Sequence, residues 1–301
     1  MKPSEDLIKK IEEELARRNE PPGSIDELNE ITRQVTQEYN DRPHPDFEGL
    51  SPSQMFFVVN QPQSEKLIAL RENIDVAFVS GLPLVRAAGI ILDHIDPDKG
   101  LKLTTTGKLP RKVVTEIHSE GIFKPEYERL RPPKVLNEDD FLPAGMGHIL
   151  LRLAGFIRIS MNKMILTRKG KAAKQDPVEL FSGLYRAFAF KYNKGWFDLY
   201  DSKEIGNVGL SFVIYLLFKY GDRMRPADFY AEKYFRAFPM VRNLTARFPN
   251  PNESCFEVRV LSRGLYLFGL IDRMEIKSKR IGKDYHYSKS KAFDIVFAVD
   301  S

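Results

Sequence analysis

The chain has one cysteine, Cys255, among its 301 residues. A lone cysteine excludes an internal disulfide and the paired C-x-x-C ligands of many zinc and redox sites. Long apolar runs are also missing, since the longest, Leu210 to Phe218 with Ser211 inside it, is too short to cross a bilayer. The first residues are acidic and carry no apolar core, unlike a secretory signal. We therefore expect a cytoplasmic protein that does not enter a membrane.

Signatures of catalysis are missing too. The five histidines show neither H-x-x-x-H nor H-E-x-x-H spacing, and the chain has no G-x-S-x-G, Walker A or dinucleotide fingerprint. The acidic stretch from Asp93 to Gly100 does not match a calcium loop, because its Gly is misplaced and no Glu stands where the twelfth ligand belongs. The sequence therefore predicts no catalytic residue, no metal and no cofactor, and an enzyme of unknown class is only the third hypothesis.

Charge is unevenly distributed along the chain. Residues 1–50 hold 7 Lys/Arg and 13 Asp/Glu, a balance of −6, whereas the whole chain carries +5, which leaves +11 for the rest. Residues 271–291 alone hold 7 Lys/Arg and 3 Asp/Glu. This asymmetry is compatible with a nucleic-acid partner or an acidic protein partner, and equally with charged residues that only face solvent.

Apolar periodicity predicts a mainly helical protein. The first helix is expected from Ser4 to about Asn19, and a second ends near Tyr39. A further helix is expected over Ser64–Arg71. The nearly continuous apolar stretch Val208–Tyr220 predicts a buried helix. Near the C-terminal end, Ala292–Val299 has the composition of a strand.

Two segments share the pattern L-T-x-x-G-K, one at Leu103–Lys108 and the other at Leu166–Lys171. Before the second lie an apolar helical run and two short strand patterns, so Ile157–Ile159 and Met164–Leu166 should pair as antiparallel strands. Thr167 should then cap the next helix. Helix, strand, turn and strand in this order are typical of a winged-helix module, but the helix is too apolar to lie in a DNA groove. We therefore interpret this module as one used for packing.

The last part of the chain repeats the order of a helix followed by a hairpin. Here basic residues alternate with tyrosines, a composition that suits phosphate contacts and base stacking. Strand alternation alone would also place these charges outward. The residues that we expect to bind nucleic acid, if the chain does so, are Arg259, Arg263, Lys277, Lys279, Arg280 and Lys283.

Several motifs together resemble a known group of proteins. They are the Tyr-Asn-x-Arg-Pro segment at Tyr39–Pro43, the Gly-Leu-Ser-Pro-x-Gln-Met segment at Gly49–Met55, the two L-T-x-x-G-K segments and Leu150–Phe156. In this combination the chain is similar to an uncharacterised bacterial family and to the helical C-terminal region of plasmid open-reading-frame-3-like proteins. The resemblance implies an architecture and no named activity, and it does not extend well into the final hundred residues.

These observations predict an α+β, mainly α fold, a multi-helix protein with two winged-helix-like units. We expect an N-terminal helical region at 1–75, a central region with one such unit at 76–175, and a C-terminal helical region ending in the other at 176–301. The first hypothesis for function is a non-catalytic protein-interaction or regulatory protein. The alternative is a nucleic-acid-binding protein that uses the basic C-terminal hairpin. The partner, protein or nucleic acid, and the oligomeric state are left open.

Overall fold

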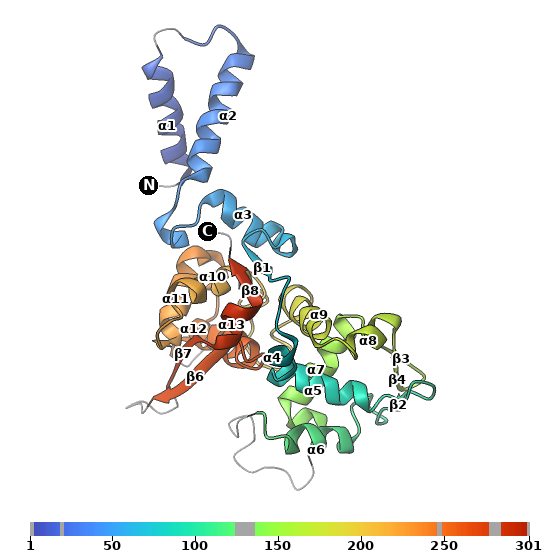
Figure 1. Ribbon diagram of the computed structural model, residues 1–301. Coiled ribbons are helices and arrows are strands. Elements are labelled where there is room, and N and C mark those ends of the chain that lie inside the picture. Colours follow the sequence, from blue (N-terminus) through green and yellow to red (C-terminus); the bar gives the residue numbers. More distant parts are fainter. Residues whose placement is uncertain (1–2, 19–20, 124–135, 246–248, 277–283, 300–301) are drawn as a thin grey trace. The chain divides into compact units, whose positions relative to one another are not determined.

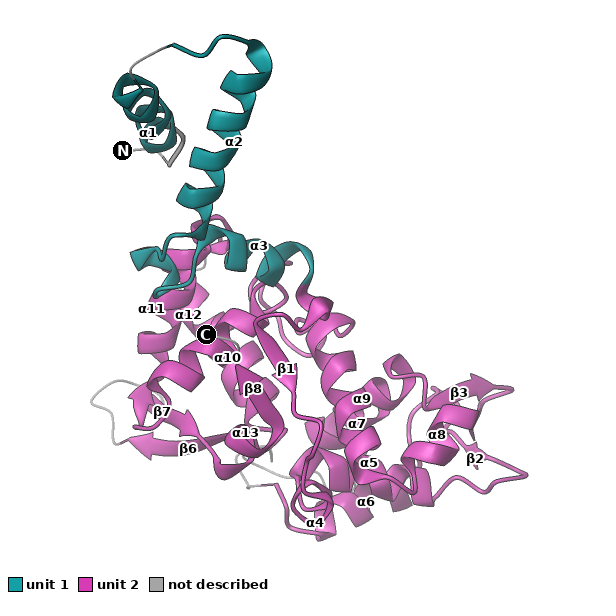
Figure 2. Ribbon diagram, turned by 45° about the horizontal axis from the view of Figure 1, so that its top comes forward, with its two compact units in different colours: residues 1–61 teal, residues 62–301 magenta. Residues whose placement is uncertain are grey.

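The computed structural model describes residues 3–18, 21–123, 136–245, 249–276 and 284–299. The chain divides into two compact units, an N-terminal unit of residues 1–61 and a main unit of residues 62–301, coloured teal and magenta in Figure 2. Helices dominate both, and the described part of the main unit adds three small antiparallel sheets. The predicted α+β, mainly α class is therefore confirmed.

The N-terminal unit begins with a hairpin of two helices. Its elements are α1 (Pro3–Arg17), α2 (Ile25–Asp41), a 3-10 turn (Pro45–Phe47) and α3 (Pro52–Asn60). Two serines start the later helices. The Ser24 hydroxyl accepts a hydrogen bond from the Glu27 amide at 3.1 Å, and Ser51 forms a full capping box with Gln54. Such caps satisfy amides that a helix start leaves without partners.

The first part of the main unit is a helix–sheet module, here called the first module (residues 83–173; Figure 1). Its sheet has the order β2-β4-β3, so the strand that comes first in the chain pairs with the last. In chain order the elements are α5 (Pro83–Asp93), β2 (Leu101–Lys102), α6 (Arg111–Ser119), a 3-10 turn (Glu138–Asp140), α7 (Leu142–Leu153), β3 (Ile157–Ser160), β4 (Lys163–Leu166) and α8 (Arg168–Ala173).

The expected strand pair is present. Ile157 lies opposite Leu166 and Ile159 opposite Met164, in an antiparallel register. Thr167 caps α8, because its hydroxyl oxygen accepts a hydrogen bond from the Gly170 amide at 2.9 Å. Both predictions for this hairpin are confirmed.

A second module (residues 210–296) repeats the element order and the strand order of the first. Its sheet runs β5-β7-β6, and again a six-residue helix, capped by Ser290, follows the last strand. The elements are α10 (Leu210–Tyr220), β5 (Arg225–Pro226), α11 (Ala227–Ala237), a 3-10 turn (Pro239–Val241), α12 (Pro251–Phe256) continuing as a π-helix (Glu257–Leu265), β6 (Ile271–Ile276), β7 (Asp284–Lys289) and α13 (Lys291–Val296). The prediction of a buried helix here is confirmed by α10, in which Phe212, Val213 and Leu216 are fully buried.

Between the modules, α9 (Pro177–Phe190) carries aromatic side chains that join their cores. Phe181 and Phe188 both contact Phe268, and Tyr185 contacts Phe297. The helix itself packs against α5 and α7 of the first module. Burial of such rings is a major stabilising contribution in a core.

The main unit also contains a 3-10 turn (Pro62–Ser64), a short helix α4 (Val76–Ser80), and a two-stranded sheet of β1 (Ile68–Leu70) with β8 (Phe297–Val299). Two sequence-based expectations are wrong here. Ser64–Arg71 is not a helix, and only the last three residues of Ala292–Val299 form a strand. Pairing between segments that are far apart in sequence decides both conformations, because β1 and β8 hydrogen-bond to each other.

Candidate interaction site

The Arg259 side chain is enclosed by the protein and uses all of its hydrogen-bond donors there. Its Nε and Nη2 donate to the two carboxylate oxygens of Asp198, at 2.7 and 2.8 Å. Nη1 donates to the carbonyls of Ser202 and Ile205 at 2.9 and 3.1 Å, and Nη2 also to that of Tyr200 at 3.1 Å. A guanidinium has five N–H donors, so none is left for a ligand.

All of these acceptors lie in the connection between α9 and α10. Residues 193–207 of this connection are called the clamped loop below. Two glycines let it approach the guanidinium closely. A Cβ on Gly195 would lie 2.7 Å from Arg259 Nη2, and one on Gly206 would lie 3.2 Å from Arg259 Cβ. Gly206 also has φ of +80°, a backbone conformation that other residues rarely adopt. The sequence therefore folds this loop tightly around one side chain.

The clamped loop contacts helices of both modules. Arg263 of the π-helix donates from Nη1 to the Phe197 carbonyl at 2.6 Å. The Phe197 ring lies against α7 of the first module, where a Cβ on Gly145 would be 3.2 Å from its Cζ. The loop is thus held on two sides. Two hydrogen bonds within it stiffen the backbone further. The Trp196 amide donates to the Asn193 carbonyl, and the Asp198 amide donates to the Gly195 carbonyl.

Two apolar side chains of this loop face solvent although their neighbours are held inside. Trp196, the single tryptophan of the chain, is 65% exposed, and Leu199 is 104% exposed. Asp198 between them is 4% exposed at its side chain because it pairs with Arg259. Exposed apolar surface on an ordered, anchored loop is typical of a protein-binding contact.

Lys194 lies at the inner side of the loop. It is buried, its Nζ donates to the Phe188 carbonyl at 3.1 Å, and the same nitrogen is 4.6 Å from the centre of the Phe188 ring. Burial lowers the pKa of the Lys194 amine to about 7, because removal from water disfavours the charged form. The Lys194 amine is therefore only about half charged at neutral pH.

The residues predicted to contact nucleic acid are not brought together by the described part of the chain. Arg259 does not face outward, as the helical pattern suggested, because its pairing with Asp198 holds it in the interior at 2% exposure. Arg263 is half-buried and donates to a backbone carbonyl of the clamped loop. The other four, whose role stays a prediction, lie outside the described residues: Lys277, Lys279, Arg280 and Lys283.

Sequence reasoning missed Asp198, Trp196 and Leu199. A signal was present, since Gly195, Gly206 and several Asn and Asp residues surround the single tryptophan in a stretch without apolar periodicity. Such a composition is typical of a tight loop that presents a side chain. The partner of Arg259 could not be identified in this way, because Asp198 is 61 positions away.

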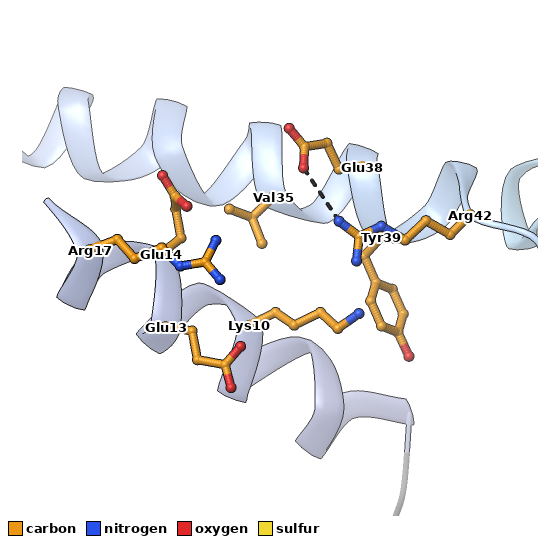
Figure 3. A pocket seen from close by; sticks show the side chains of 8 residues that line it. All are labelled: Lys10, Glu13, Glu14, Arg17, Val35, Glu38, Tyr39 and Arg42. Carbon is orange, nitrogen blue, oxygen red and sulfur yellow. Dashed lines mark ion pairs between the residues drawn. The ribbon is translucent and has the colours of Figure 1, made fainter.

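A concave region lies between α1 and α2 in the N-terminal unit (Figure 3). It encloses about 260 Å³. Its lining holds three cations and three carboxylates, so the charges balance. Arg42 pairs with Glu38 at 3.7 Å, and Lys10 Nζ lies 5.1 Å from the centre of the Tyr39 ring. We regard it as a solvated groove between amphipathic helices, lined by Lys10, Glu13, Glu14, Arg17, Val35, Glu38, Tyr39 and Arg42.

Neither a metal-binding cluster nor a membrane-spanning helix is found among the described residues. These residues contain no group of three or more His, Cys, Asp or Glu side chains that could hold a metal ion. None of their helices combines the length and the apolar character needed to cross a bilayer.

Comparison with known proteins shows a family likeness over part of the chain. Residues 80–179 match the family model described as the Y4jL N-terminal domain, a segment that runs from the end of α4 to the start of α9. No curated protein and no solved structure matches the chain. The match includes the whole first module and ends before the clamped loop. Over the first module, the chain is therefore similar to the Y4jL N-terminal domain family.

Proposed function

We propose that this chain is a non-catalytic protein-interaction or regulatory protein, and that the clamped loop is its contact with a protein partner. The observation that carries the proposal is the exposure of Trp196 and Leu199 on a loop whose backbone is anchored by the buried Arg259–Asp198 pair. Tryptophan is among the residues most enriched at the energetic centres of interfaces. A loop that is ordered before binding loses less conformational entropy on association, which favours affinity.

The architecture supports a packing and binding role. Each module has the element order and the strand order that are typical of a winged helix, and the motif resemblance to plasmid open-reading-frame-3-like proteins is compatible with this interpretation. In DNA-reading winged helices, the helix before the hairpin enters the major groove. Here Met146, Leu150 and Leu151 of α7 are buried, as are Val260 and Leu261 of the π-helix. These helices are used for packing, which leaves loops and sheet faces for contacts.

The alternative site at the C-terminal hairpin receives little support from its described strands. Over 271–276 and 284–289 they hold Asp272, Glu275 and Asp284 against Arg273 and Lys289. Lys289 in turn pairs with Asp222 and Asp294, at 2.9 and 3.0 Å. The basic excess of this hairpin therefore lies in residues 277–283. Binding of nucleic acid there remains a prediction.

The test uses a photo-crosslinking amino acid at position 199 in the full-length chain, in cells that express it. The matched control places the same group at Met240, which is 72% exposed and lies outside the loop. A protein captured from position 199 but not from position 240 is then purified, and its affinity for the wild-type chain and for Trp196→Ser is measured. We expect Trp196→Ser to weaken binding about thirtyfold, as for an interface hot spot.

Two outcomes would contradict the proposal. One is capture of the same set of proteins from positions 199 and 240. The other is a purified partner that binds Trp196→Ser as tightly as the wild type.

A further inference from the structure

The first module carries a basic surface that is separate from the clamped loop. In the sheet, Lys102 lies opposite Lys163, and Arg158 lies opposite Ile165. Because alternate residues of a strand point to the same side, these three cations share one face of the sheet. The opposite face carries Ile157 and Met164, which are buried at 3% and 0% exposure. The charged face is therefore the outer one.

The helix α8, which is also basic, follows β4 directly and lies next to it (Figures 1 and 2). Residues 157–175 contain six Lys/Arg and no Asp/Glu. Lys169 pairs with Glu179 at 3.7 Å and Lys174 with Asp93 at 3.1 Å. Within this sheet and α8, the exposed cations that form no ion pair with any part of the chain that the structure describes are Lys102, Arg158, Lys163, Arg168 and Lys171.

The tip of this hairpin is narrow, rigid and apolar. Met161 and Asn162 form a two-residue turn with φ of +47° and +57°, values typical of a type I′ hairpin. The Asn162 side chain donates to the carbonyls of Leu103 and Thr104, at 3.3 and 2.9 Å, which fixes the tip to the segment after β2. Met161 is 94% exposed. An apolar side chain is thus presented at the end of a basic hairpin.

We propose that the outer face of β2-β4-β3, together with α8, binds the phosphate backbone of duplex DNA, and that Met161 enters the minor groove. Five unpaired cations suit a polymer that carries one negative charge per about 1.7 Å of axis. Single strands are usually held by aromatic stacking, and this face carries no aromatic side chain, because its members are Lys102, Arg158, Ser160, Lys163 and Ile165.

The hairpin tip favours DNA over duplex RNA. The minor groove of B-DNA is about 6 Å wide and about 7.5 Å deep, so it admits a single side chain such as that of Met161 rather than a whole two-stranded ribbon. Apolar wedges that enter it between base steps include methionine. The minor groove of A-form RNA is wide and shallow and would not enclose the tip. Phosphate contacts carry no sequence information, so we expect binding with little sequence preference.

The experiment titrates the full chain against a labelled DNA duplex of mixed sequence at several salt concentrations. In the triple variant Lys102→Gln, Arg158→Gln and Lys163→Gln, the log–log salt slope should become shallower by about 0.9 for each phosphate that is no longer neutralised. Met161→Ser should weaken binding and leave the salt slope unchanged, because it removes no charge. The matched control, Lys112→Gln, Lys203→Gln and Arg223→Gln, removes three exposed cations elsewhere and should bind as the wild type does.

One further variant and two further nucleic acids distinguish binding of duplex DNA at this surface from binding at another site or of another nucleic acid. The fourfold glutamine variant of Lys277, Lys279, Arg280 and Lys283 should retain most of the affinity. Single-stranded DNA and duplex RNA should bind more weakly than duplex DNA. The inference is overturned if the wild type does not bind at low salt, if the control triple weakens binding as much as the sheet triple, or if single strands or RNA bind more tightly. It is also overturned if the fourfold variant alone abolishes binding. Circular dichroism confirms that each variant is folded, and the crosslinking result at position 199 is independent of all these outcomes.

Discussion

Arg259 and Asp198 form a two-point ion pair in the protein interior, with side chains that are 1% and 4% exposed. Both charges have left water, which is costly unless every donor and acceptor finds a partner. The clamped loop supplies these partners through its backbone carbonyls. The loop conformation and the buried charge therefore depend on each other.

Arg259→Met should be strongly destabilising. The variant leaves the Asp198 carboxylate buried without its cation, a change that typically costs about 3–5 kcal/mol. Urea unfolding followed by the fluorescence of Trp196, the single tryptophan, measures this directly. Arg223→Met serves as the control, because Arg223 is exposed and its replacement should change the free energy of unfolding by no more than about 0.5 kcal/mol. Similar effects of the two substitutions would show that the buried pair does not hold the loop.

Stability should rise with pH between about 7 and 10 because of Lys194. Burial lowers the pKa of this amine to about 7 in the folded chain, whereas a solvated lysine has a pKa of about 10.4. Between these values the unfolded chain binds the extra proton, so the free energy of unfolding increases with pH, by up to about 1.4 kcal/mol per unit. The penalty is complete below pH 7 and absent above the unfolded pKa.

Urea unfolding at pH 7, 8, 9 and 10 tests this. Lys194→Met should flatten the rise, and the exposed control Lys203→Met should keep it. Equal pH profiles for the wild type and Lys194→Met would show that the amine is charged in the folded chain.

Cys255 should be unreactive in the folded protein. The residue is fully buried, and burial raises the pKa of its thiol to about 12. The thiolate is the nucleophile, so at pH 8 the folded chain should react with a thiol reagent at least about a hundredfold more slowly than the unfolded chain. Absorbance assays with and without urea compare the two rates. Complete labelling within minutes in the absence of urea would contradict the buried placement.

Gly170→Ala should destabilise the first module. A Cβ at this position would overlap the Phe156 carbonyl oxygen, so α8 would have to move away from the start of β3. Overpacking of this kind typically costs about 1–3 kcal/mol. Gly89→Ala in α5 is the matched control, since no atom lies within 4 Å of its Cβ, and it should stabilise the chain by about 0.5–1 kcal/mol. Thermal unfolding of both variants decides the sign of each effect.

Features set by neighbouring residues were predictable from the sequence. The hairpin of Ile157–Ile159 with Met164–Leu166 follows from alternation and a short turn, and the Thr167 cap follows from the residue type before a helix.

Arg259 was placed wrongly because hydropathy assigns arginine to the surface, and only the fold shows that Asp198 and the surrounding carbonyls compensate its charge. The composition around Trp196 and Leu199 is a local signal of a tight loop, but the conformation that exposes these two side chains depends on this distant pair.

The pairing of β1 with β8 also bears on how the chain is made. Ile68 pairs with Val299 and Leu70 with Phe297, and the Arg71 side chain donates to the Phe297 carbonyl at 2.9 Å. At translation rates of about 5–20 residues per second, β1 leaves the ribosome roughly 10 to 45 s before its partner is synthesised. During that interval its backbone is an open edge that other chains can pair with. The two strands of this sheet therefore cannot pair until residues 297–299 have emerged from the ribosome.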